Sequence, residues 1–192
     1  MFTEFRAALR PAIVLLILFT LVTGLAYPAL IAGIAQLAFP AQANGSLIRD
    51  GDTIVGSELI AQGFAGPGYF HPRPSAAGKG YDASASAATN LAPGSKDLAE
   101  AIKTRVPEND GGAVPADLVT TSASGLDPHI SPEAAMLQAA RVADARGLPV
   151  ERVRILVDAS VETPLLGFLG EPRVNVLLLN RQLDRIGGKP PA

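Results

Sequence analysis

The sequence has no cysteine, no tryptophan and no excess of positive charge. Without cysteine, a disulfide framework is excluded, and so are thiolate chemistry and thiolate metal sites. The formal net charge of -2 gives no support for a nucleic-acid partner or for binding to anionic lipid. What is abundant instead is glycine (19 residues) and proline (16 residues), which is typical of a loop-rich domain.

Charged residues are also absent from one long segment, which runs from residue 11 to residue 48. Most of this segment is apolar, and it exceeds the roughly 20 residues that a helix needs to cross a bilayer. We predict a transmembrane helix over residues 12–39 that contacts the lipid bilayer. Residues 1–11 then form one flank, and residues 40–192 form a single domain beyond the membrane.

The flanking charges predict the orientation of this helix. Arg6 and Arg10 precede it, whereas the first basic residue after it is Arg49. Because Lys and Arg close to a span tend to remain in the cytoplasm, the N-terminus is expected inside and the domain outside. In a Gram-negative cell, the chain would be a single-pass protein of the inner membrane with a periplasmic domain.

A cleaved signal peptide is the alternative interpretation. Ala41 and Ala43 form an A-x-A cleavage pattern behind a basic N-terminus. A signal peptide has an apolar core of only about 7–15 residues, however, and this one is nearly twice as long. We therefore favour a retained anchor, and both interpretations export the domain.

Small residues within the predicted span indicate contact with another helix. Ala29 and Gly33 form a small-xxx-small pair, which lets two helices approach closely. Pro28 removes one helix hydrogen bond and is expected to kink the helix. Since glycine and proline are common in membrane helices, a passive anchor remains the alternative.

The exported part is predicted to be a mixed α+β domain. Asp50-Gly51 lies between two short apolar runs and indicates a β-hairpin. Residues 65–94 are rich in Ala, Gly, Ser and Pro without a clear period, and we expect a long ordered loop there. Residues 174–179 are rich in Val and Leu and predict a strand, with a short final helix over residues 181–186.

Three further helices are expected between the loop and this strand. Ser95 is a good N-cap for the first, which should end at Pro107. Ser131 followed by Pro132 is a strong start signal for the second, and Gly147 should end it. The third should begin near residue 149, where valines recur at helical spacing.

The search for catalytic chemistry returns mainly negative results. Asp127, His129 and Ser131 lie within five residues, but the groups of a nucleophilic triad must converge from separate elements. A metal site that combines His71 with His129 and Asp127 is possible if two loops meet, although no ligand spacing supports it. Structural histidines are the preferred interpretation. The segment around Lys79 lacks the glycine spacing and the Ser or Thr of a phosphate-binding loop.

Four segments follow the N-terminal span in a recognisable order. They are YFHPRPSA from residue 69, PADLVT from residue 115, SGLDPHIS from residue 124 and GEPRVNVL from residue 170. These segments and their order resemble those of the Kdp C subunit family, the C subunits of potassium-transporting ATPases. The resemblance covers nearly the whole chain.

This resemblance implies a non-catalytic subunit of Kdp, a high-affinity, ATP-driven potassium uptake complex. In such a complex, KdpA contains the potassium-binding pore, KdpB hydrolyses ATP, and the small KdpF is a further component. KdpC is described as an assembly subunit and as a catalytic chaperone that raises the affinity of KdpB for ATP. The chain is therefore expected to hold no cofactor or metal of its own, with ATP and potassium bound at the level of the complex.

The resemblance also indicates candidate site residues. Gln62 matches the glutamine of a family G-Q-x-F stretch, with Ala61 in place of the glycine, and is a candidate for the effect on nucleotide affinity. The other motif residues are candidates for partner contacts or structure: Tyr69, His71, Arg73, Asp117, Asp127, His129, Ser131, Glu171, Arg173 and Asn175.

A second class of function stays open at this point. A free-standing, membrane-anchored periplasmic binding protein or enzyme would show the same anchor and the same export. The predicted location of the domain outside the membrane separates it from cytosolic ATP, so any effect on ATP affinity should be indirect. Recovery of large membrane partners would distinguish the component of a complex from the free-standing protein.

Overall fold

The computed structural model describes residues 2–106, 113–164 and 166–187 of the chain. The chain forms two compact units, residues 1–47 and residues 48–192. Pro107, the predicted end of a helix, lies outside the described residues. The second unit combines helices with two small sheets, which confirms the predicted α+β class.

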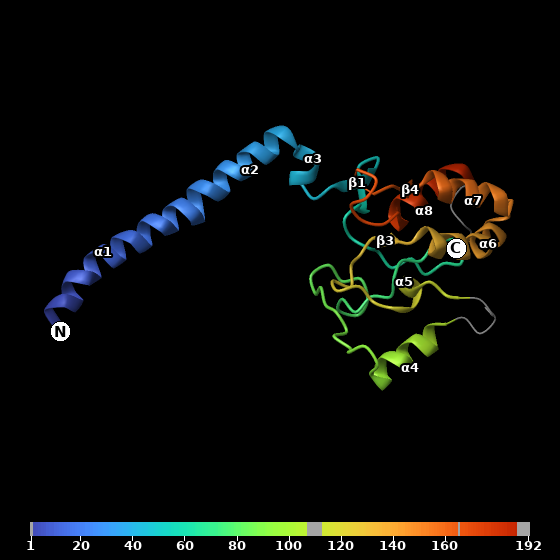
Figure 1. Ribbon diagram of the computed structural model, residues 1–192. Helices are drawn as coiled ribbons and strands as arrows, with labels where there is room; N and C mark the ends of the chain where they lie inside the picture. Colours follow the sequence, from blue (N-terminus) through green and yellow to red (C-terminus); the bar gives the residue numbers. More distant parts are fainter. Residues whose placement is uncertain (1, 107–112, 165, 188–192) are drawn as a thin grey trace. The chain divides into compact units, whose positions relative to one another are not determined.

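The first unit is dominated by one uninterrupted helical segment (Figure 1). It consists of α1 (Phe2–Leu21), a π-helical turn (Val22–Ala26) and α2 (Tyr27–Ala38), and a short helix α3 (Pro40–Ala43) follows. Among the described residues, one helix is long and apolar enough to cross a membrane. It spans Thr3–Ala38 and contains an 18-residue window with a mean hydropathy of 2.3.

The π-helical turn explains how this helix accommodates a proline. Pro28 has no N–H group, so one carbonyl of the preceding turn would lose its partner in a regular α-helix. The structure places the π-helical turn directly before Pro28, and the Tyr27 N–H donates to the Val22 carbonyl five residues earlier. Such single π turns are known causes of local irregularity in helices.

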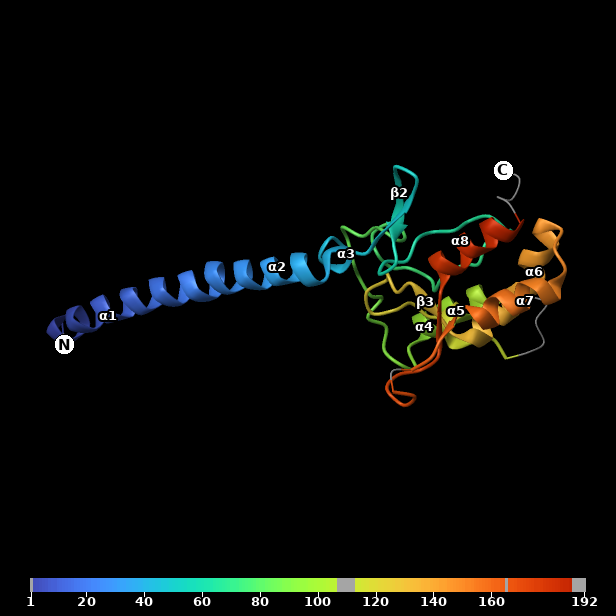
Figure 2. The same ribbon diagram turned by 90° about the horizontal axis from the view of Figure 1, so that it is seen from above.

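The second unit begins with the predicted hairpin. Strands β1 (Leu47–Asp50) and β2 (Thr53–Ser57) pair around Asp50-Gly51. Residues 65–94 then form a long ordered loop without helix or strand, as expected. In Figure 2, the hairpin projects from the body of the domain.

The three helices predicted between the long loop and residue 174 are confirmed, and the second unit has one additional short helix. Helix α4 (Lys96–Arg105) begins at Ser95, whose Oγ accepts a hydrogen bond from the Leu98 N–H. The short α5 (Ala116–Val119) was not predicted. Ser131 caps α6 (Pro132–Arg146), and Gly147 ends it in the left-handed conformation. Helix α7 covers Val150–Ala159.

The C-terminal region contains the one clear error of the sequence analysis. The predicted strand over residues 174–179 is wrong beyond Asn175, because β5 (Arg173–Asn175) passes directly into α8 (Val176–Gly187). The Asn175 Oδ1 accepts a hydrogen bond from the Leu178 N–H, 3.2 Å away, and so caps the helix. The high strand propensity of Val174 and Val176 is overridden by this cap and by packing.

A three-stranded antiparallel sheet lies beside these helices, in the order β3 (His129–Ile130), β5 and β4 (Val161–Glu162). Ile130 pairs with Val174 on one side, and Val161 pairs with Val174 on the other. Helices α6, α7 and α8 gather at one side of the domain (Figure 1). The buried core joins one face of each helix to the sheet and to Phe70 of the long loop.

Candidate functional site

Side chains from all four family-like segments meet in one hollow of about 530 Å³, which we call the motif hollow. The long loop, α5, the segment before α6 and the approach to β5 each contribute to it. Seven of the candidate residues line it: Arg73, Asp117, Asp127, His129, Ser131, Glu171 and Arg173. The fold therefore brings together residues that lie up to 100 positions apart (173 minus 73).

Arg73 connects the long loop to the opposite wall of the motif hollow. Its guanidinium contacts the Asp127 carboxylate at 3.3 Å. The same group donates to the Thr120 hydroxyl at 3.4 Å and to the Thr121 carbonyl at 3.3 Å. These contacts hold the loop in place, because a single planar group bridges three points of the neighbouring segment.

Asp127 organises the turn that leads into β3. Its Oδ1 accepts a hydrogen bond from the His129 N–H at 3.0 Å and lies 3.5 Å from the His129 ring. Burial by itself would raise the pKa of Asp127. The interactions with His129 and the positive charge of Arg73 outweigh burial, however, and hold the pKa below its ordinary value. Asp127 is thus an anionic anchor of the motif hollow.

Ser131 has a structural role at the start of α6. Its Oγ accepts a hydrogen bond from the Ala134 N–H at 3.1 Å, which caps α6. The Ser131 hydroxyl donates to Asp117 Oδ1, and the Ser131 N–H donates to Asp117 Oδ2 at 2.6 Å. The hydroxyl proton is therefore directed at Asp117 and not at His129, and the helix start is tied to α5.

The two histidines lie in different surroundings. His129 lines the motif hollow, whereas His71 lies beside a separate hollow with Gln138 and Arg141. In the part of the chain that the structure describes, no three His, Cys, Asp or Glu side chains gather closely enough to hold a metal ion. The alternative that combines the two histidines in one site thus receives no support from the geometry.

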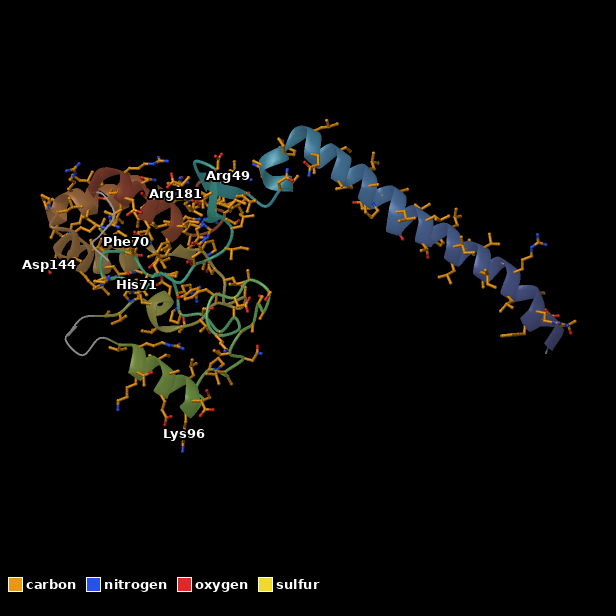
Figure 3. The ribbon with its side chains drawn as sticks, turned by 180° about the vertical axis from the view of Figure 1, so that it is seen from behind. Arg49, Phe70, His71, Lys96, Asp144 and Arg181 are labelled. Atoms are coloured by element: carbon orange, nitrogen blue, oxygen red, sulfur yellow. The ribbon has the colours of Figure 1, made fainter. Side chains whose placement is uncertain are left out.

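His71 and its neighbours join the long loop to the core (Figure 3). The His71 N–H donates to Gln138 Oε1 at 2.8 Å, and the Gln138 Nε2 donates back to the His71 carbonyl at 3.1 Å. The His71 Nε2 lies 3.1 Å from the Gly66 carbonyl. Burial lowers the pKa of His71, the Gly66 contact partly opposes this, and the charge of Arg141 lowers the pKa further.

The lowered pKa of His71 predicts a loss of stability in mild acid. The unfolded chain takes up a proton near pH 6.5, but the folded domain resists it. The contribution of His71 to the free energy of unfolding is therefore fully present above about pH 6.5, and it is lost as the pH falls through the folded pKa. Denaturant unfolding of the full chain in detergent at pH 7.5 and pH 5.0 should show this decline. We expect the decline to be smaller in His71→Gln and unchanged in the control His129→Gln. Equal declines in the two variants would contradict the assignment of the decline to His71.

Tyr69 is also placed away from the motif hollow. The Arg146 guanidinium lies 4.7 Å from the centre of the Tyr69 ring, a cation–π contact. The Tyr69 hydroxyl is 3.5 Å from Asp184 Oδ2, and Arg146 forms an ion pair with Asp184 at 2.7 Å. The Arg146 side chain is only 1% exposed. These contacts link the long loop to α6 and α8.

Gln62 holds the hairpin against the domain. Its Nε2 donates to the Val55 carbonyl at 3.0 Å. The amide fills the space beside Gly56 so completely that a Cβ on this glycine would lie 1.7 Å from Nε2. Arg181 of α8 also contacts the hairpin, because its guanidinium donates to the Arg49 carbonyl at 3.0 Å. Arg49 and Arg181 are labelled in Figure 3. Gln62 thus has a clear structural role in this unit.

Asn175 does not line the motif hollow. It is 4% exposed, and its Nδ2 donates to the Glu58 carbonyl at 2.7 Å. Together with the cap on α8, this bond gives Asn175 two structural contacts. The residue therefore joins the end of β2 to the start of α8.

The sequence analysis missed several buried polar residues that support these loops. Gln138 and Asn180 lie on the buried faces of α6 and α8, and Arg141 donates to the carbonyls of Pro67 and Tyr69. A detectable signal was the placement of Gln138 and Asn180 within helical faces that are otherwise apolar. Such buried polar groups require partners, and here the partners are backbone groups of the long loop.

Comparison with known proteins adds a family context to this geometry. The family model described as KdpC, K+-transporting ATPase, c chain, matches residues 9–185. The chain is 61% identical over 181 residues to the potassium-transporting ATPase KdpC subunit of Caulobacter vibrioides (strain NA1000 / CB15N), and 92% of each chain is covered. It is 57% identical to the KdpC subunit of Myxococcus xanthus, with 100% of this chain and 92% of the relative covered. The Bradyrhizobium diazoefficiens KdpC subunit is 53% identical, with 94% and 98% covered.

Proposed function

Because the chain belongs to the KdpC family, the c chain of the K+-transporting ATPase, we propose that it is a non-catalytic subunit of this complex. In this role it assembles and stabilises an ATP-driven potassium uptake system. Its proposed partners are the potassium-binding KdpA, the ATP-hydrolysing KdpB and the small KdpF. ATP and potassium are then ligands of the complex, and the chain itself holds no cofactor.

The observation that carries the non-catalytic role is the internal bonding of the motif hollow. Arg73 and Asp127 neutralise each other, and Ser131 is engaged with both Asp117 and the start of α6. Nucleophilic catalysis needs a hydroxyl or thiol beside a general base. In the motif hollow, the charged and hydroxyl groups instead connect separate loops, which supports the proposal that they build a binding surface.

The proposed orientation follows from the charges around the apolar helix. Arg6 and Arg10 precede it and should remain in the cytoplasm, which directs the domain to the periplasmic side of the inner membrane. Ala29 and Gly33 are the proposed contact points for a helix of a partner protein, and a Cβ on Gly33 would meet no heavy atom within 4 Å. Coupling through such helices is the proposed route by which the chain raises the ATP affinity of KdpB.

Purification of the tagged chain in mild detergent tests the proposed membership of the complex. We expect two larger membrane proteins and one small one to be recovered with it, because an assembly subunit must remain bound to its partners. Recovery of the chain alone would favour a free-standing anchored binding protein, with the motif hollow as its site. Potassium-stimulated ATP hydrolysis should follow the assembled fraction and be absent from the isolated chain.

A reporter that is active only in the periplasm tests the orientation. Fused to the C-terminus, it should be active, and protease added to spheroplasts should digest the domain while the N-terminal segment stays protected. A cytoplasmic reporter fused at the same site is the matched control and should be inactive. The opposite pattern would overturn the orientation and place the domain within reach of cytosolic ATP.

A further inference from the structure

The loop between β4 and β5 ends in an exposed apolar tip. The antiparallel pair Glu162 and Arg173 closes its base, where the Arg173 Nε and the Glu162 carboxylate are 2.9 Å apart. Beyond this ion pair the loop extends from the body of the domain, as the orange segment of Figure 2 shows. Leu166, Phe168 and Leu169 are 75%, 72% and 52% exposed.

These exposures stand out in the second unit. Among its described residues, Leu166 and Phe168 are the two most exposed large apolar side chains. No charged residue occurs from residue 163 to residue 170. Isolated apolar residues on a surface need no explanation, but three large ones within four positions form a patch of the kind that marks interaction sites.

Two backbone features of described residues lie at this tip. The Gly167 N–H donates to the Pro164 carbonyl at 3.0 Å. Leu166 has a φ of +57°, a left-handed conformation that is unfavourable for a residue with a Cβ.

We infer that Leu166, Phe168 and Leu169 form a docking tip that inserts into an apolar pocket on another protein of the complex. This inference rests on the proposed function, because it requires such a complex. The tip would act as the buried anchor of the interface. A few side chains near the centre of an interface, packed in fully desolvated pockets, carry most of its binding energy.

The charges that frame the tip favour a protein partner over a lipid surface. Loops and helices that enter the membrane interface combine apolar residues with Lys or Arg, which are attracted to anionic lipid. Here the nearest charged residues on the two sides are Glu162 and Glu171, and Arg173 is already paired with Glu162. The frame thus has a net charge of -1 (two carboxylates and one guanidinium), which anionic lipid would repel.

The motif hollow supplies the polar part of the same interface. Glu171 lies on the returning limb of the loop, Arg173 begins β5, and both residues line the hollow. A partner that receives the tip is therefore led toward a surface with both acidic and basic side chains. An apolar anchor beside a polar rim is the usual anatomy of a specific protein interface.

Photocrosslinking of the assembled complex tests this inference. Because the chain has no cysteine, Phe168→Cys introduces a unique thiol on this chain, which can carry a benzophenone maleimide. The matched control is Ile155→Cys on α7, where the native side chain is 67% exposed. The wild-type complex, treated in the same way, gives the background from cysteines of the partner proteins.

We expect the label at position 168 to form an adduct with a partner protein in at least fivefold higher yield than the label at position 155. Equal yields, adducts with lipid alone, or adducts with a second copy of this chain would overturn the inference. If the wild-type chain is recovered without any partner, the proposed function fails and the docking tip fails with it. If the partners are recovered and the yields are equal, the docking tip alone fails.

A second measurement compares Phe168→Ser/Leu169→Ser with Ile155→Ser. We expect the double variant to be retained in the complex about tenfold less well after extended washing, as is typical when interface anchors are lost. Ile155→Ser should be retained like wild type. Because both sites are exposed, the melting temperature of the isolated chain should not change, which separates lost docking from lost folding. Full retention of the double variant would overturn the inference.

Discussion

Gly125→Ala is expected to destabilise the domain by about 3 kcal/mol. Gly125 is buried in the SGLDPHIS segment and has a φ of +67°. A Cβ there would lie 2.7 Å from the Ala87 carbonyl oxygen and 2.8 Å from the Ala77 nitrogen. The left-handed backbone contributes about 1 kcal/mol of the loss, and the overlap with fixed backbone atoms contributes about 2 kcal/mol. Denaturant unfolding of the full chain in detergent measures the change.

Gly147→Ala is the matched control for this prediction. Gly147 has nearly the same backbone conformation, with a φ of +63°, but a Cβ there would meet no heavy atom within 4 Å. Its replacement should therefore cost only about 1 kcal/mol, the part that arises from the backbone. Equal losses of stability at the two positions would show that close packing between the SGLDPHIS segment and the long loop does not add to the loss at Gly125.

Asn180→Leu is expected to destabilise the domain by a similar amount, about 3 kcal/mol, for a different reason. Asn180 is 1% exposed, and Phe70 beside it is fully buried. The Asn180 Oδ1 accepts a hydrogen bond from the Phe70 N–H, and its Nδ2 donates to the Phe70 carbonyl, both at 2.9 Å. Leucine has a similar size but leaves both backbone groups buried without partners, at about 1–3 kcal/mol each.

Gln182→Leu provides the comparison on the same helix. Gln182 is half-buried, and its side chain accepts a long hydrogen bond of 3.4 Å from the Ser160 hydroxyl. Its replacement should change stability by less than about 1 kcal/mol. Thermal and denaturant unfolding of both variants measure the difference. If Asn180→Leu proved as mild as Gln182→Leu, the long loop would not depend on α8 for its position.

Local signals explain why much of the helical structure could be predicted. Ser95 and Ser131 act through hydrogen bonds to groups only three residues away, and Gly147 acts through its own backbone conformation. Such signals are complete within a few residues, so a sequence pattern suffices to detect them. The short strands β3 and β4 were missed because two residues are too few to show a period.

The end of β5 shows where local preference is insufficient. Residues 174–179 favour a strand by composition, yet Asn175 ends the strand with a side-chain cap and α8 packs on the core. Whether a Val- and Leu-rich run becomes a strand or a buried helix depends on what lies beside it. That information comes from residues distant in the sequence and is not contained in the run itself.

The order of the amino acids was sufficient to establish the apolar helix, the α+β class, the starts of α4, α6 and α7, and the family. Each of these depends on composition, on short-range hydrogen bonds or on the order of the motifs. The packed fold was needed to show that Arg73, Asp127 and Arg173 share one hollow while His71 lies elsewhere. It was also needed to show that the apolar side chains at the tip of the β4–β5 loop remain exposed. The physical reason is that convergence and exposure are set by the packing of distant segments, which no local pattern encodes.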